Sequence, residues 1–152
     1  MLIIKPYQTI LVPLDGSENS QIALAHAIYL AEQCHAAISL LHVVNLSSVF
    51  ALSPYEQSNY VLMKDVQDSL EEIGKKVLSE AASKIPAVIK THSSLEFGSP
   101  GHIIVETAEK LKADLIVMGS RGLGPVKGLF MGSISNYVTG HSPIPVFIVR
   151  SV

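Results

Sequence analysis

The chain has 152 residues and a formal net charge of −2, with 48% hydrophobic and 16% charged residues. This composition excludes a disordered chain, and the length predicts one domain, residues 1–152, with a buried core. The basic residues are few and scattered, so a nucleic acid is not expected as a ligand.

Cysteine content and apolar patterning bear on the compartment. Cys34 is the single cysteine, which excludes an internal disulfide and suits a reducing compartment. Asp, Gly, Asn or Pro interrupts every apolar run well before the ~18 residues that a membrane-spanning helix needs. Residues 1–7 also lack the apolar run of a signal peptide. A cytoplasmic protein that does not enter a membrane is therefore expected.

The first part of the chain alternates between strand and helix patterns. Residues 9–14 and 37–44 are short apolar runs, typical of strands that are buried on both faces. Between them, the Ala-rich residues 20–34 predict a helix, with Ser17 or Asn19 available to cap its first turn.

The alternation continues after an interruption. Residues 46–60 have no clear periodicity, which predicts an irregular segment. Apolar residues at three- and four-residue steps predict an amphipathic helix over 63–84. A more polar strand, suited to a sheet edge, is expected at 88–92. A turn at 97–101 then leads into a helix whose first turn contains Pro100.

The last part of the chain completes the pattern. Residues 114–118 and 143–149 predict two more strands, and a helix that Ser133 caps is expected between them. Strands that alternate with helices predict an α/β fold with a parallel sheet covered on both faces. A ligand site in such a sheet lies at the carboxyl ends of the strands.

Two glycine-containing segments are the strongest candidates for that site. Residues 119–124 follow a predicted strand, and residues 132–135 open a predicted helix. Glycines allow the backbone to approach an anion, and free amides at a helix start favour phosphate. Serine hydroxyls, Arg121 and Lys127 would add hydrogen bonds and charge. Spacing alone leaves two readings open, a polyphosphate site and a plain connecting loop, because neither GxxxxGK[ST] nor GxGxxG is present.

Three side chains, one aspartate and two histidines, need separate interpretation. Asp15, at the end of a predicted strand, is a candidate nucleotide contact, magnesium ligand, phosphoacceptor or turn residue. His42 lies in a predicted strand and is expected to be a buried, hydrogen-bonded side chain rather than a catalytic base. His26 lies in a predicted apolar helix and is expected to be a packed side chain.

Several segments together carry a family resemblance: Val12–Ser17, Leu41–Val44, Met118–Gly122, Gly132–Ser135 and Pro145–Arg150. The long-spaced pattern G-x2-G-x9-G-[ST] is met by Gly119, Gly122, Gly132 and Ser133. On these residues the chain resembles the universal stress protein family, in the branch that binds ATP. The resemblance extends over nearly the whole chain.

The resemblance implies a fold and a partner. The fold is an open five-stranded parallel sheet of order 3-2-1-4-5 with helices on both faces, a Rossmann-like three-layer sandwich of the adenine nucleotide alpha hydrolase-like type. The implied partner is a second copy of the chain, paired through the last strand at residues 146–149. Such pairing would also cover an apolar edge strand.

The resemblance also implies a binding site for ATP. The adenosine would be bordered by Pro13, Leu14 and Asp15, with Val43 against the base. The ribose and phosphate side would be lined by Met118, Gly119, Arg121 and Gly122. The phosphates would be held by Gly132, Ser133, Ile134 and Ser135. Magnesium is expected to accompany ATP, although no residue is assigned as its ligand, and AMP or another adenylate is an alternative occupant.

The implied function is an ATP-binding regulatory module of the stress response. At most slow hydrolysis is expected, because the motifs contain no identifiable general base. One alternative is a phosphoacceptor receiver domain with Asp15 modified, although only Glu18 and Arg150 stand near the places of its acidic cluster and lysine. The other is a dimerisation module that binds no nucleotide.

Overall fold

The computed structural model describes residues 3–47, 60–122 and 131–150. The elements, in chain order, are β1 (Thr9–Pro13), α1 (Glu18–Cys34), β2 (Ala37–Val44), α3 (Tyr60–Ser83), β3 (Thr91–Phe97), α4 (Pro100–Lys110), β4 (Leu115–Gly119), α5 (Ser133–His141) and β5 (Val146–Val149). Among the helices in these ranges, none combines the length and the apolarity that a bilayer crossing requires.

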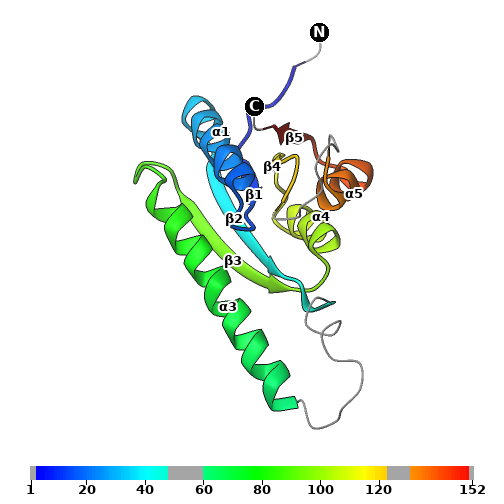
Figure 1. Ribbon diagram of the computed structural model, residues 1–152. Helices are drawn as coiled ribbons and strands as arrows, with labels where there is room; N and C mark the ends of the chain where they lie inside the picture. Colours follow the sequence, from blue (N-terminus) through cyan, green and yellow to red (C-terminus); the bar gives the residue numbers. More distant parts are fainter. Residues whose placement is uncertain (1–2, 48–59, 123–130, 151–152) are drawn as a thin grey trace.

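The strands form one parallel sheet of order β3-β2-β1-β4-β5 (Figure 1). This order confirms the expected 3-2-1-4-5 arrangement. The central strand β1 pairs with β2 on one side, Thr9 opposite Ala37, and with β4 on the other, Ile10 opposite Leu115. Its residues Ile10, Leu11 and Val12 are fully buried, as the continuous apolar run predicted.

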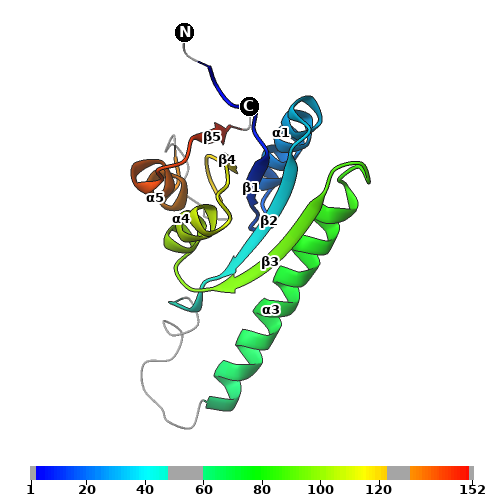
Figure 2. The same cartoon turned by 180° about the vertical axis from the view of Figure 1, so that it is seen from behind.

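Helices cover both faces of the sheet, which gives the three-layer sandwich (Figures 1 and 2). Ile10 and Val12 contribute to a core with α1 and α3, whereas Leu11 contributes to a second core with α4 and α5. Successive strand residues point to opposite faces, so one buried strand supplies both cores.

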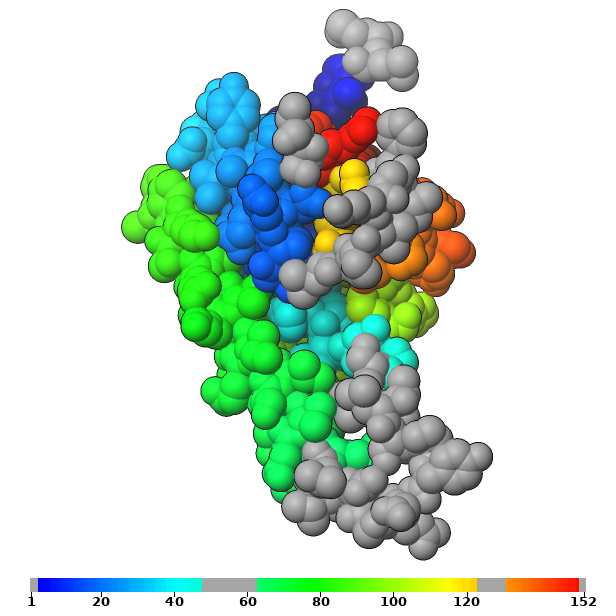
Figure 3. Space-filling view, viewed as in Figure 1, coloured from blue at the N-terminus to red at the C-terminus, as the bar shows by residue number. Residues whose placement is uncertain are grey.

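The helix α3 is longer than the strands that it covers. It has 24 residues and therefore spans roughly 36 Å, whereas the 8 residues of β2 span about 26 Å. Its first half accordingly projects past the sheet, beyond the helix α1 in the space-filling view (Figure 3). This projection brings α3 residues to the carboxyl edge of the sheet.

The prediction for β3 was wrong in position. A strand was expected at residues 88–92, but the structure places it at Thr91–Phe97. Val88 is 88% exposed, and the Ile89 amide donates to the Pro86 carbonyl in a turn. The polar sequence of β3 is tolerated because β3 lies at the edge of the sheet, and that part of the prediction is confirmed.

Two helix starts also differ from the predictions. The helix α1 begins at Glu18 rather than at Ser20, and the predicted cap by Ser17 is confirmed, since its hydroxyl accepts a hydrogen bond from the Ser20 amide. The helix α5 is capped by Gly132 rather than by Ser133, which is its first helical residue. The irregular segment expected at 46–60 lies largely outside the described residues.

Candidate functional site

A cavity of about 730 Å³ opens at the carboxyl ends of β1 and β4. These neighbouring strands are followed by helices on opposite faces of the sheet, α1 after β1 and α5 after β4. The loops that leave the two strands therefore part, and a crevice forms between them. This is the position at which the sequence predicted a ligand site.

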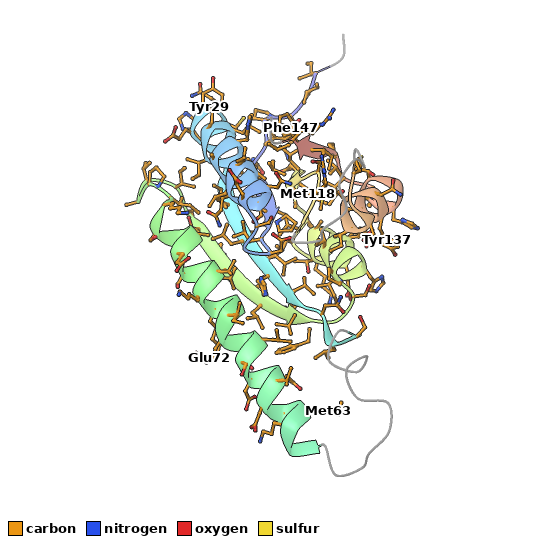
Figure 4. The ribbon with its side chains drawn as sticks, viewed as in Figure 1. Tyr29, Met63, Glu72, Met118, Tyr137 and Phe147 are labelled. Atoms are coloured by element: carbon orange, nitrogen blue, oxygen red, sulfur yellow. The ribbon has the colours of Figure 1, made fainter. Side chains whose placement is uncertain are left out.

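Every residue that the family resemblance assigns to the site lines this cavity. They come from the ends of β1, β2 and β4 and from the start of α5: Pro13, Leu14, Asp15, Val43, Met118, Gly119, Arg121, Gly122, Gly132, Ser133, Ile134 and Ser135. Met118 lies in the middle of the molecule, on the side of the sheet that α4 and α5 cover (Figure 4). Lys127, also considered from the sequence, lies outside the described residues.

Other lining residues were missed by the sequence reasoning. They are Ser20, Leu41, His42, Val44, Asn45, Leu70, Ile73, Pro100, Ile104 and Met131. Leu70 and Ile73 lie near the middle of α3, where it passes the carboxyl edge of the sheet, and Ile73 is 56% exposed. The unusual length of the amphipathic pattern at 63–84 was the one signal that a helix extends past the sheet.

The β1 side of the cavity is fixed by hydrogen bonds to β2. The Leu14 amide donates to the Leu41 carbonyl at 2.8 Å, and the Leu14 carbonyl accepts from Nδ1 of His42 at 2.8 Å. In the next residue, Oδ1 of Asp15 accepts from the Ser17 amide at 2.9 Å. The backbone that carries Asp15 is therefore held on both sides. The hydrogen bond expected for His42 is confirmed, but its side chain is half-buried rather than buried. His26 is exposed, and its ring packs against Phe147 of β5 with the ring centroids 5.9 Å apart.

Gly119 and Gly122 are both in close contact with the β1–α1 region. A Cβ on Gly119 would lie 2.9 Å from Cβ of Asn19 and 3.1 Å from its carbonyl carbon. A Cβ on Gly122 would collide with Oδ2 of Asp15. The loop is also tied by the Asn19 side-chain amide, which donates to the Arg121 carbonyl at 3.2 Å. Packing within the protein thus accounts for both glycines.

Gly132 differs from these two glycines. Its backbone is extended, with φ −75° and ψ 168°, a conformation that any residue adopts. A Cβ there would lie 3.5 Å from Cα of Arg121 and from the Ser120 carbonyl oxygen, which is ordinary contact. Packing within the described structure therefore does not require glycine at position 132. Glycine at this position leaves the start of α5 accessible from the cavity.

The first turn of α5 presents backbone amides at the cavity. Gly132 has no side chain to cap them, and its own amide donates to the Ser120 carbonyl at 2.6 Å. The amides at the start of a helix have no acceptor within the helix, and the helix dipole favours an anion there. The arrangement is chemically suited to binding a phosphate or a carboxylate.

Ser135 does not have the free hydroxyl that the sequence suggested. It is 2% exposed, and its Oγ donates to the Ser120 carbonyl at 2.7 Å, with the Gly132 carbonyl 3.1 Å away. The hydroxyl proton is thereby used to hold the glycine loop against α5. Ser133, by contrast, is exposed at the mouth of the same turn.

Asp15 is the carboxylate among the described residues that line the cavity, and Arg121 supplies a positive charge. The described residues contain no group of three or more His, Cys, Asp or Glu that could hold a metal ion. Glu18 and Arg150, which a receiver-type site would need, do not belong to the described lining.

The side chains whose pKa values are shifted lie on the outer surfaces of helices. A hydrogen bond from Lys75 to Glu71 raises the pKa of Lys75, and the hydrogen bond between Lys110 and Glu106 lowers the pKa of Glu106. Both pairs are exposed and four residues apart on α3 and α4, so they serve the helices and not the cavity.

Comparisons of the whole chain with known proteins point to one family. Residues 6–150 match the sequence model of the universal stress protein family. Universal stress protein MJ0531 of Methanocaldococcus jannaschii is 34% identical over 147 residues, which are 95% of this chain and 82% of that protein.

Solved structures give the same result for the fold. The hypothetical protein MJ0577 superposes with a TM-score of 0.85 at 27% identity, over 97% of this chain and 99% of that one. A universal stress protein in complex with cAMP has a TM-score of 0.64 at 27% identity, over 96% of this chain and 98% of that one. The strand order, the glycine pattern and the match over residues 6–150 agree, and the chain belongs to the universal stress protein family.

Proposed function

We propose that the cavity binds an adenylate, ATP in the first place, and that the protein acts as a nucleotide-dependent regulatory module of the stress response. The observation that carries this proposal is that the open start of α5 at Gly132 and the carboxylate of Asp15 line the same cavity. The amides of α5 suit phosphates, and the carboxylate is an acceptor for ribose hydroxyls.

The three parts of a nucleotide have matching surroundings. The base would lie against Val43 and the apolar residues of β2 and α3. The ribose would lie near Asp15, and the phosphates at the amides of residues 133–135 with Arg121 alongside. A volume of about 730 Å³ lies within the ~300–1,000 Å³ that is usual for small-molecule sites.

The adenylate class is favoured by a relative as well as by the geometry. The related universal stress protein that is 27% identical to this chain was solved with cAMP. A monophosphate such as AMP or cAMP would use the same base and ribose surroundings as ATP, with fewer contacts at α5. We therefore propose adenylates as the ligand class, with ATP the preferred member.

Magnesium would enter with ATP. Mg²⁺ in nucleotide sites is commonly held by one or two carboxylates together with the phosphates. Asp15 fits that requirement only in part, since its Oδ1 already accepts from the Ser17 amide. Neutralisation of phosphate charge is the chemistry that the ion would supply.

Fast ATP hydrolysis is not part of the proposal. Efficient phosphoryl transfer needs a positioned base or water-orienting group and several charges around the γ-phosphate. The described lining offers the Asp15 carboxylate, Arg121 and His42, whose Nδ1 is hydrogen-bonded to the Leu14 carbonyl. We therefore propose that ATP is hydrolysed slowly at most, and that the regulatory signal is whether nucleotide is bound.

A homodimer through β5 is the second part of the proposal. The strand β5 lies at the edge of the sheet, and Phe147 on it is 42% exposed. An apolar edge strand is stabilised when a second copy covers it. The single thiol of Cys34 suits the cytoplasm as the compartment of this dimer.

Two measurements test the nucleotide proposal. Mass spectrometry of small molecules released from denatured, freshly purified protein is expected to detect an adenine nucleotide. Added Mg-ATP is expected to stabilise stripped protein by about 2.7 kcal/mol at a 100-fold excess over Kd. GTP at the same concentration serves as the control for general phosphate binding. A protein without released nucleotide and without a thermal shift in Mg-ATP, AMP or cAMP would contradict the proposal.

A further inference from the structure

His42 connects the helix α3 to the Asp15 side of the cavity. Its Nδ1 donates to the Leu14 carbonyl at 2.8 Å, immediately before Asp15 in the chain. A carbonyl oxygen can only accept, so Nδ1 carries the proton. His42 is also one of the residues that line the cavity. His42 thus contacts both the ligand space and the backbone that carries the carboxylate.

The other side of the His42 ring lies against Gly74 of α3. A Cβ on Gly74 would lie 2.5 Å from Cδ2 and 3.0 Å from Nε2 of His42, and 2.8 Å from Cδ1 of Leu95. Glycine is an unfavourable residue in the middle of a helix, because it loses more backbone entropy than any other residue. The space that the His42 ring occupies gives a physical reason for Gly74.

We infer that His42 is a positioning residue of the nucleotide site, through which α3 holds Asp15 in place. The contacts form a series: Gly74 leaves room for the ring, the ring donates to the Leu14 carbonyl, and the next residue, Asp15, has its Oδ1 held by the Ser17 amide. The inference rests on the proposed adenylate site for its effect on affinity. It assigns a role to Gly74, which is outside the cavity lining, and to His42, which the family resemblance did not assign to the site.

Three variants separate positioning from simple packing. In His42→Asn the side-chain amide places a donor near the position of Nδ1, whereas His42→Leu keeps similar bulk without a donor. Gly74→Ala keeps the imidazole but requires it to move away from the new Cβ. Gly140→Ala is the matched control, because it makes the same helix substitution where a Cβ would meet nothing within 4 Å.

The first measurement needs no nucleotide. Amide hydrogen exchange of Ser17 reports on Asp15, because the Ser17 amide donates to Oδ1 of Asp15. His42→Leu and Gly74→Ala are expected to raise its exchange rate about 10-fold, while His42→Asn and Gly140→Ala stay near the parent rate. Equal Ser17 exchange in all four variants and the parent would overturn the inference.

The second measurement is the affinity for ATP by titration calorimetry. His42→Leu and Gly74→Ala are expected to bind about 10-fold more weakly, with affinity retained in His42→Asn. Loss of affinity in Gly140→Ala, or no rescue by asparagine, would overturn the inference while leaving the adenylate site intact. A parent protein that binds no adenylate would overturn the proposed function, and the Ser17 exchange rates would then decide the positioning role by themselves.

Discussion

Asp15 and Gly122 lie against each other at the edge of the cavity, and Oδ2 of the carboxylate fills the space that a side chain at position 122 would need. The two residues are far apart in the sequence and lie in the loops that follow β1 and β4, the two strands between which the sheet order reverses. The absence of a side chain at position 122 therefore leaves room for the carboxylate, in addition to any contact that Gly122 itself makes with a ligand.

The substitution Gly122→Ala is expected to displace the Asp15 carboxylate. We expect ATP affinity to fall about 10-fold or more, because the ribose acceptor moves away from its position. A double-mutant cycle with Asp15→Ala checks the cause by calorimetry. The losses should be far from additive, since without the carboxylate the new methyl group has nothing to displace. Additive losses would show that Gly122 acts independently of Asp15.

Removal of the Asp15 charge is expected to weaken binding with little change in fold. Asp15→Asn keeps an oxygen that accepts from the Ser17 amide, so the unfolding temperature should remain close to that of the parent protein. ATP affinity should change by about 5- to 10-fold, because a charged acceptor forms a stronger hydrogen bond than a neutral one. Asp114→Asn is the matched control: Asp114 binds the amides of Gln8 and Thr9 and does not belong to the described lining, so its loss should leave ATP affinity unchanged.

A side chain at position 132 is expected to block phosphate binding at the start of α5 while preserving the fold. Gly132→Ala should change the free energy of unfolding by less than about 1 kcal/mol, because the backbone there is extended and the Cβ fits. We expect ATP affinity to fall about 10-fold in this variant and nucleotide retention to be lost in Gly132→Val.

The control for the substitutions at position 132 is a glycine near the other end of α5. Gly140→Ala lies on the same helix with open space around it and should leave affinity unchanged. Full retention of nucleotide by folded Gly132→Val would place the phosphates somewhere other than the start of α5.

A charge on the edge strand β5 is expected to separate the proposed dimer. Phe147→Asp should reduce the mass measured by light scattering from about twice 16.3 kDa to 16.3 kDa, because a buried unpaired carboxylate opposes strand pairing. Val88→Asp places the same charge on an apolar side chain that is 88% exposed and precedes the opposite edge strand, so it should remain dimeric. A dimeric Phe147→Asp protein, or a monomeric parent, would exclude this interface.

Buried strands were the part of the fold most accessible from the sequence. The apolar runs at 9–14 and 37–44 match β1 and β2 within one residue, since a strand buried on both faces must be apolar throughout. The strand β3 was misplaced for the opposite reason. Its residues Thr91, Ser93 and Ser94 are polar, so no apolar run marks where the strand begins and ends, although this polarity did predict its place at the sheet edge.

The motifs of the family resemblance identified part of the lining of the cavity but not its internal contacts. The glycine pattern brought Gly119, Gly122 and Gly132 into one list, although packing explains the first two and not the third. The free hydroxyl expected for Ser135 donates to Ser120 instead, and the contact of Gly74 with His42 had no sequence signal. Such contacts depend on how distant elements meet, which residue spacing within one segment does not encode.

The most direct test of the adenylate site is a crystal structure of the protein grown with Mg-ATP. We expect base density beside Val43, the ribose at Asp15, and phosphate oxygens within hydrogen-bond distance of the amides at the start of α5. Nucleotide density elsewhere on the protein, or an ATP whose phosphates point away from Gly132, would contradict this expectation.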